Sequence, residues 1–171
     1  MSQGIFVWVL GDSEKIELYG KLIQGILKEF FPCTIILTEK SVQEGLCEGE
    51  SQNDDLKIII TQKMIWVGNL IEKGGGAAIA LSSFSRRSER DSARKKASAF
   101  MEVLIRGKLP PELEAPYYPE IEIDENDGEE ECKKKILQAL QSMGIAGASE
   151  SQYNESEEEI VKKRLEKLGY L

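Results

Sequence analysis

The sequence predicts an α/β fold of three layers, in which helices cover both faces of a mostly parallel sheet of about five strands, followed by an acidic helical extension. Short apolar runs recur along the first two thirds of the chain, and amphipathic segments separate them. This alternation is typical of βαβ units, whose strands are parallel. The charge indicates the extension: residues 1–113 carry 15 basic and 15 acidic side chains, so the formal net charge of −8 lies entirely in residues 114–171.

The expected strands share a short core of β-branched or small apolar residues, bounded by polar or turn residues. The central strand is expected from Asp55 to Gln62, because its core is three consecutive isoleucines, Ile58 to Ile60. Residues 120–123 alternate polar and apolar side chains, which favours an edge strand. The five predicted strands are residues 5–10, 33–37, 55–62, 77–81 and 120–123.

Helices are predicted where apolar residues recur at spacings of three and four. Those of the sheet region are residues 16–30, 40–48, 64–72 and a basic helix at 86–105, which Gly107 and two prolines end.

The extension has its own predicted elements. Residues 132–143 and 157–168 are expected to be helices, joined by a linker of Ser, Gly, Ala and Glu at 146–156. We therefore divide the chain into an α/β domain, 1–123, and an acidic helical extension, 124–171.

The composition excludes several kinds of chemistry. The chain of 171 residues contains no histidine, so the usual general base and the commonest metal ligand are missing. Cys33, Cys47 and Cys132 are odd in number and widely spaced, which predicts neither a disulfide framework nor a metal site. No apolar run approaches the ~18 residues of a membrane span, and the start shows no secretion signal, so a cytoplasmic location is expected.

No phosphate-binding glycine loop is recognised in the sequence. The glycines at 74–76 precede a strand, whereas a phosphate cradle follows a strand and opens a helix. Gly11-Asp12-Ser13 is similar to the opening block of GDS-type esterases, but that chemistry needs a base to accept the serine proton, ordinarily a histidine. We therefore expect Asp12 or Ser13 to cap a helix.

Polar side chains follow the expected strands at their carboxyl ends, which is the rim where sheets of this kind bind ligands. The candidate ligand-binding residues are Asp12, Ser13, Thr61, Gln62, Ser82 and Ser83. Their hydroxyl and amide groups favour binding of a phosphate compound or nucleotide. We expect no cofactor and no metal.

A basic segment predicts a binding face. Residues 86–108 hold eight basic side chains against three acidic ones, and the candidate partner-binding residues are Arg86, Arg87, Arg90, Arg94 and Lys95. We expect a protein partner here, with the acidic extension able to cover the same face from its own chain or from a neighbouring subunit, which leaves a homo-oligomer open. The acidic total argues against nucleic acid, and no membrane partner is expected.

Residues 4–113 resemble the receiver domain of two-component response regulators, which has a flavodoxin-like fold. Val9 to Glu14 is similar to the first receiver strand and its acidic pair, and Asp55 to Thr61 is similar to the strand that carries the phospho-acceptor. Ala78 to Ser83 is similar to the strand that ends in the switch residue, here Ser82.

The departures from the receiver pattern decide the chemistry that the resemblance implies. Only Asp12 remains of the pair that holds Mg²⁺, and the acceptor position falls at Ile60 or Thr61, neither of which is a carboxylate. The family's lysine has no clear match, and Lys108 is the nearest in order. The resemblance therefore implies a pseudo-receiver that cannot be phosphorylated by the aspartyl route.

The sequence thus predicts a regulatory or protein-interaction module that acts in signalling and is not an enzyme. Two alternatives remain open at this stage. One is binding of a phosphate compound or nucleotide at the carboxyl ends of the strands, and the other is a structural subunit of a larger assembly.

Overall fold

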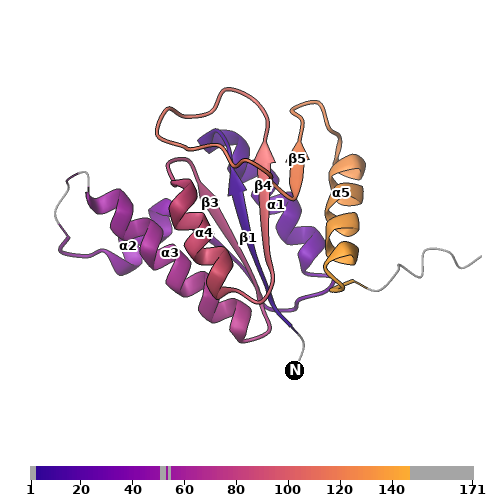
Figure 1. Ribbon diagram of the computed structural model, residues 1–171, viewed down its shortest axis with the longest axis horizontal. Helices are drawn as coiled ribbons and strands as arrows, with labels where there is room; N and C mark the ends of the chain where they lie inside the picture. The colour runs from indigo at the N-terminus through magenta and orange to yellow at the C-terminus, as the bar shows by residue number, and fades with distance from the viewer. Residues whose placement is uncertain (1–2, 51–52, 54, 147–171) are drawn as a thin grey trace, which may run out of the picture.

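The computed structural model describes residues 3–50, 53 and 55–146 and contains a five-stranded sheet with the order β2-β3-β1-β4-β5 (Figure 1). The strands are β1 (Ile5–Leu10), β2 (Thr34–Thr38), β3 (Ala77–Ser82), β4 (Phe100–Ile105) and β5 (Ile121–Ile123). The helices are α1 (Ser13–Leu27), α2 (Glu39–Leu46), α3 (Asp55–Lys73), α4 (Arg87–Lys96) and α5 (Glu129–Ser142). Every strand pair is parallel. The predicted three-layer α/β architecture with five strands is therefore confirmed.

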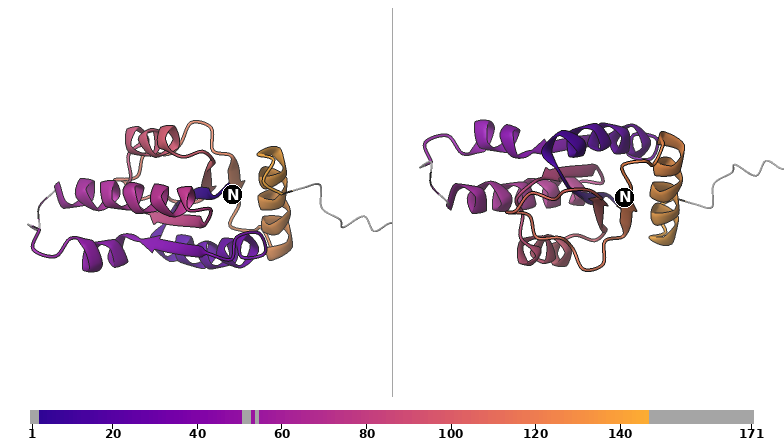
Figure 2. Two further views of the ribbon diagram at one scale, coloured as in Figure 1. Left: turned by 90° about the horizontal axis from the view of Figure 1, so that it is seen from below. Right: turned by 90° about the horizontal axis from the view of Figure 1, so that it is seen from above.

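The helices form the two outer layers. Helix α1 covers one face of the sheet, and α3 and α4 cover the other, while α2 packs beside α3 and β2. Helix α5 lies at the β5 edge of the sheet (Figure 2), and its buried side chains join the core on the α1 side. The central strand β1 is buried on both faces, so its consecutive side chains alternate between two separate cores. This double burial explains why its sequence is an uninterrupted apolar run.

Helix α3 approaches the sheet closely at Gly68. A Cβ atom on this glycine would lie 2.3 Å from Cζ of Phe6. The Phe6 ring is itself packed against Trp8 and Phe100, at 5.4 and 5.5 Å between ring centroids. The missing side chain of Gly68 therefore sets the distance between α3 and the strand beneath it.

The expected central strand at 55–62 is wrong, because these residues form the first half of α3. Leu56, Ile60 and Met64 recur at a spacing of four and are buried against the sheet, whereas Ile58 and Ile59 are only partly buried. The apolar stripe of a long helix thus outweighs the β preference of three isoleucines.

The basic helix predicted at 86–105 is also wrong in its second half. Helix α4 ends at Lys96, and Phe100–Ile105 form β4, which pairs with β1 and β5. Strand β4 is the neighbour of β1 in the middle of the sheet, a place that the sequence analysis gave to residues 55–62.

The extension is described only in part. Helix α5 lies where a helix was predicted at 132–143, and it packs against α1 and β5. The predicted helix at 157–168 and nearly all of the linker lie outside the described residues. Within the described part of the chain, no helix is both long and apolar enough to cross a membrane.

Candidate ligand-binding site

The carboxyl edge of the sheet begins with a short link between β1 and α1. Only Gly11 and Asp12 separate the two elements, and Oδ1 of Asp12 accepts a hydrogen bond of 3.1 Å from the backbone N–H of Glu14. The Asp12 carboxylate therefore caps the N-terminus of α1, the place where a helix would otherwise offer its amides to an anion. The predicted capping role of this residue is confirmed.

A second carboxylate, Glu39 at the start of α2, holds the loop that follows β3. Its Oε1 accepts the backbone N–H of Ser83 at 2.7 Å, and its Oε2 accepts the Ser83 hydroxyl at 2.9 Å. Burial raises the pKa of Glu39 above its ordinary value, although the hydrogen bonds from Ser83 oppose this shift. The clamp fixes the β3–α4 loop next to Phe84.

This arrangement predicts a pH-dependent stability that Glu39→Gln removes. The unfolded chain loses the Glu39 proton near the ordinary pKa of about 4.3, whereas the folded chain keeps it to higher pH. The folded state binds more protons in that interval, so the free energy of unfolding falls as the pH rises through it. Urea unfolding at pH values below and above this interval measures the free energy of unfolding, which should fall with pH in the wild type and change less in Glu39→Gln. If the two proteins showed the same dependence on pH, Glu39 would not be the group responsible.

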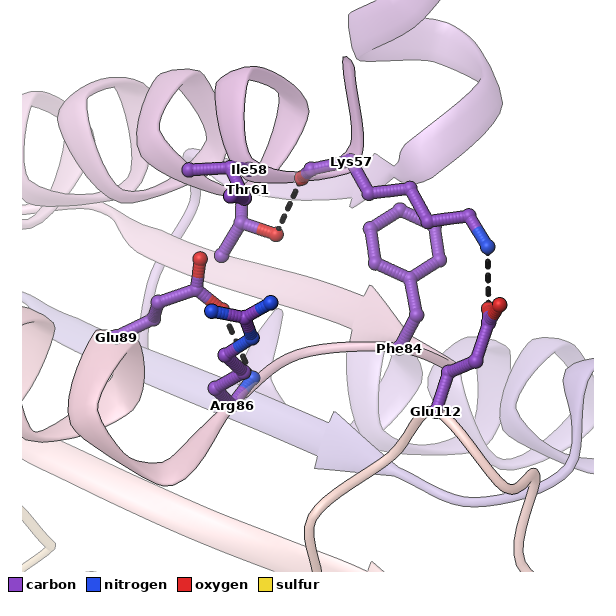
Figure 3. Close-up of a pocket in the computed structure, with 7 residues that line it drawn as sticks. All are labelled: Lys57, Ile58, Thr61, Phe84, Arg86, Glu89 and Glu112. Carbon is purple, nitrogen blue, oxygen red and sulfur yellow. Dashed lines mark hydrogen bonds and ion pairs between the residues drawn. The ribbon is translucent and has the colours of Figure 1, made fainter. Parts of the chain in front are cut away.

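A pocket of about 390 Å³ opens beside this loop, between α3, α4 and the segment after β4 (Figure 3). We call it the Arg86 pocket. Its lining residues are Lys57, Ile58, Thr61, Phe84, Arg86, Glu89 and Glu112. The volume lies within the range of small-molecule sites, about 300–1,000 Å³.

The charges of the Arg86 pocket differ in how they are paired. Lys57 on α3 forms an ion pair with Glu112, and its ammonium lies 5.5 Å from the centroid of the Phe84 ring. The guanidinium of Arg86 points toward Thr61 (Figure 3), and among the described residues it forms no ion pair. The pocket therefore offers one unpaired guanidinium, a second cation that a carboxylate holds, and an aromatic face.

A buried arginine fixes two walls of this pocket to each other. Arg90 on α4 is fully buried, and its Nε donates to Oε1 of Glu102 at 2.7 Å. The same guanidinium donates to the carbonyl oxygens of Ser85 at 2.8 Å and Glu114 at 2.6 Å. Because Ser85 precedes Arg86 and Glu114 follows Glu112 by two residues, Arg90 ties both edges of the pocket to β4.

The structure separates the six candidate ligand residues. Asp12 and Ser13 lie at the start of α1, and Thr61 and Gln62 lie on α3 and not at the end of a strand. Thr61 lines the Arg86 pocket, and its hydroxyl donates to the carbonyl of Lys57 at 2.9 Å.

The other residues of this set face elsewhere. Gln62 lines a different groove, beside Trp66. Ser82 is buried at the end of β3 and accepts the N–H of Ser85 at 3.1 Å, while Ser83 is held by Glu39. Of the six, the structure brings only Thr61 to the Arg86 pocket.

The five candidate partner-binding residues are mostly engaged within the fold. Ion pairs join Arg87 to Glu114, Arg90 to Glu102, and Arg94 to both Glu102 and Glu120. Arg86 faces the pocket, and Lys95, like its neighbour Lys96 on α4, forms no ion pair with the described residues. The predicted basic face is therefore largely neutralised by carboxylates of the same chain.

Sequence reasoning missed Lys57, Phe84, Glu89 and Glu112 as pocket residues. The sequence places Lys57 inside a strand, so it does not indicate that residues of α4 and of the segment after β4 lie beside it. Phe84 carried a usable signal, because a large aromatic residue stands between Ser83 and Ser85 in a loop at the carboxyl end of a strand.

No protein-family model and no curated protein matches the sequence. Solved structures do match. A hexameric APS kinase from Thiobacillus denitrificans is 23% identical with a TM-score of 0.69, and the match covers 86% of this chain and 31% of that one. The Mycobacterium tuberculosis APS kinase in complex with AMPPNP and APS is 14% identical with a TM-score of 0.68, over 82% and 99% of the two chains. A gluconokinase from Sinorhizobium meliloti is 15% identical with a TM-score of 0.53, over 82% and 92%.

These matches show that the chain shares its fold with these three kinase structures, although it spans about a third of the first of those proteins. The resemblance to a receiver domain is therefore wrong. The prediction of a pseudo-receiver that acts in signalling and is not an enzyme is wrong on the same finding, because the three similar structures named above are kinases. The alternating strands and helices of the two folds are similar enough to explain the error.

The phosphate-binding motif that gives P-loop proteins their name is absent from the sequence after β1. That motif, Gly-x-x-x-x-Gly-Lys, would require glycine and lysine at the positions of Ile16 and Glu17 when it is started at Gly11. Residues 13–17 already belong to α1, so no long loop is available to surround a phosphate. The Arg86 pocket is thus the better candidate for holding an anionic ligand.

Proposed function

We propose that this protein is a kinase-type nucleotide-binding protein whose ligand occupies the Arg86 pocket. The observation that carries the proposal is the Arg86 guanidinium, which points into a cavity of about 390 Å³ and forms no ion pair within the described part of the chain. Guanidinium groups recognise phosphate through paired, charge-assisted hydrogen bonds.

The rest of the pocket is suited to the remaining parts of a nucleotide. Phe84 presents a ring in the β3–α4 loop, where a planar base can stack on it. Thr61 and Glu89 supply polar oxygens near Arg86, and Lys57 supplies a second positive charge. Apolar surface with a few convergent polar groups is the usual composition of small-molecule sites.

The similar structures support the choice of ligand class. The Mycobacterium tuberculosis protein was solved with AMPPNP and APS, both of which carry phosphate. In α/β sheets, ligands bind outside the carboxyl ends of the strands, and the Arg86 pocket lies at that edge of this sheet.

Arg86→Gln is expected to weaken nucleotide binding at least about tenfold. A hydrogen bond to a charged group contributes about 1.5–3 kcal/mol, and every 1.4 kcal/mol changes the dissociation constant tenfold. Isothermal titration calorimetry with AMP, APS and AMPPNP would measure the loss, with phosphoryl transfer from ATP followed in parallel. The matched control is Lys95→Gln, which removes a positive charge from α4, the helix that Arg86 precedes, outside the pocket. Equal affinities of wild type and Arg86→Gln for every ligand that binds would refute the proposal.

A further inference from the structure

An exposed groove lies on the outer side of α3, away from the Arg86 pocket. Its cavity measures about 170 Å³, and we call it the Trp66 groove after its largest side chain. Trp66 is 66% exposed and Leu70, one helical turn further on, is 57% exposed. Lys73 and Lys96 lie at the same groove, so an apolar stripe ends beside two positive charges.

One buried group in this groove lacks a hydrogen-bonding partner. Asn69 is 6% exposed, and its side-chain nitrogen donates to the carbonyl of Ile65 at 2.8 Å. Its Oδ1 finds no donor among the described residues. A buried carbonyl oxygen without a donor costs free energy, so a ligand that brings an N–H or O–H group to this position gains by pairing with it.

The groove lies at the amino edge of the sheet. Helices α3 and α4 run back from the carboxyl edge, so their last turns, with Lys73 and Lys96, lie where β3 and β4 begin. Helix α5 runs in the same direction and ends at the same edge (Figure 1). The chain therefore leaves the described part of the structure on the side of the molecule where the groove opens.

The sequence beyond α5 contains a segment complementary to this groove. Residues 157–171 begin with three glutamates, Glu157 to Glu159, and continue with apolar residues at a helical spacing of four and three, Val161, Leu165 and Leu168. The glutamates match the lysines of the groove in charge, and the apolar residues match Trp66 and Leu70.

The intervening chain is long enough to reach the groove. The strand that α3 covers, β3, is three strand spacings from β5, which amounts to roughly 15 Å within the plane of the sheet. The layer formed by α3 adds roughly 10 Å more, since packed layers lie about that far apart. The ten residues 147–156 can span up to roughly 33 Å when extended. The path around the β5 edge is therefore within their reach.

We propose that residues 157–171 of the chain dock in the Trp66 groove of the same molecule. Val161, Leu165 and Leu168 cover Trp66 and Leu70, and the leading glutamates pair with Lys73 and Lys96. The charge pattern of the sequence predicts that the extension covers the basic helix, but Arg87, Arg90 and Arg94 of that helix already pair with carboxylates of the described residues. Lys73 and Lys96, at the amino edge, form no ion pair with the residues that the structure describes, so they are available to it.

Tryptophan fluorescence of the full chain tests this proposal directly. The chain has two tryptophans, and Trp8 is fully buried while Trp66 is exposed on α3. Acrylamide quenching reports whether Trp66 is covered, and Trp66→Phe gives the signal of Trp8 alone. We expect weak quenching in the wild type and a severalfold larger quenching constant for Trp66 in the double variant Leu165→Gln, Leu168→Gln. The control, Lys163→Gln with Lys167→Gln, changes the opposite side of the segment and should quench like the wild type.

Two results would overturn the proposal. Strong quenching of Trp66 in the wild type, unchanged in the double variant, would mean that nothing covers the groove. Weak quenching of Trp66 that becomes stronger when the protein is diluted, together with a dimer in sedimentation, would mean that a second copy of the chain occupies the Trp66 groove. Either result leaves the nucleotide proposal untouched, because the Trp66 groove and the Arg86 pocket share no residue.

Discussion

Arg90→Met is expected to lower the free energy of unfolding by about 3–5 kcal/mol, the range measured when one partner of a buried ion pair is removed. Arg90 is fully buried, and the substitution leaves Glu102, whose side chain is 10% exposed, with only the partly exposed Arg94 as its counter-charge. The carbonyl oxygens of Ser85 and Glu114 lose their donors at the same time. Urea denaturation followed by circular dichroism measures the change.

The control for this prediction is Arg106→Met. Arg106 also pairs with a carboxylate, Glu122, but its side chain is 59% exposed. Solvent screens such a pair, so the free energy of unfolding should hardly change. If Arg90→Met were as stable as Arg106→Met, the Arg90 network would not hold the fold together.

Gly68→Ala is the second substitution with a large expected effect, and its sign is opposite to that of helix propensity. Alanine in the middle of a helix normally stabilises by about 1 kcal/mol relative to glycine. Here the new Cβ would meet the ring of Phe6 at 2.3 Å, and Trp8 and Phe100 hold that ring in place. We expect a net loss of about 1–3 kcal/mol from overpacking, measured by thermal or urea unfolding.

Gly25→Ala provides the matched comparison in another helix. Gly25 lies on the exposed side of α1, and nothing lies within 4 Å of its would-be Cβ. This variant should gain about 0.5–1 kcal/mol. A gain in both variants would show that α3 can move away from the sheet, and the close approach at Gly68 would then carry no structural constraint.

The sequence predicted four of the five strands, because the pattern of each depends on local burial. Residues 5–10, 33–37 and 77–81 are short apolar runs with turn residues beside them, and 120–123 alternates as an edge strand does. The layers follow from the alternation of these runs with helices. The parallel direction of every strand follows as well, since each connection contains a helix or a long crossing segment.

The error at α3 came from reading three β-branched residues apart from their surroundings. Ile58, Ile59 and Ile60 favour a strand locally, but the buried residues Leu56, Ile60 and Met64 continue a helical stripe well past them. Tertiary packing decides between the two, because α3 has a whole sheet face to cover. A short apolar run cannot by itself distinguish a buried strand from a buried helix.

The failure to predict strand β4 has a different cause. It follows α4 after only three residues, Ala97 to Ala99, and none of them is glycine or proline. The basic helix pattern therefore seemed to continue into Phe100 and Met101. Glu102 added to the error, since a charged residue is unexpected in a central strand until its buried partner Arg90 is known.

The candidate site could be predicted only in its general location. The carboxyl edge of the sheet was expected to hold it, and Thr61 does line the pocket. The sequence places Arg86 on an outer surface, because the basic residues of the helix predicted at 86–105 are expected to face solvent. Lys57 and Glu112 are 55 residues apart in the sequence, and only the three-dimensional fold brings their charges together.

The ion pair of Lys57 and Glu112 also has a consequence for ligand selection. An anion that reaches Lys57 competes with Glu112 for the ammonium, so part of its binding is an exchange of one anionic group for another. A monoanionic carboxylate gains little from such an exchange, whereas a phosphate with two negative charges competes better for the ammonium. If the pocket binds anions as proposed, we expect it to discriminate by ligand charge, and its affinity to depend less on ionic strength than that of a site with two free cations.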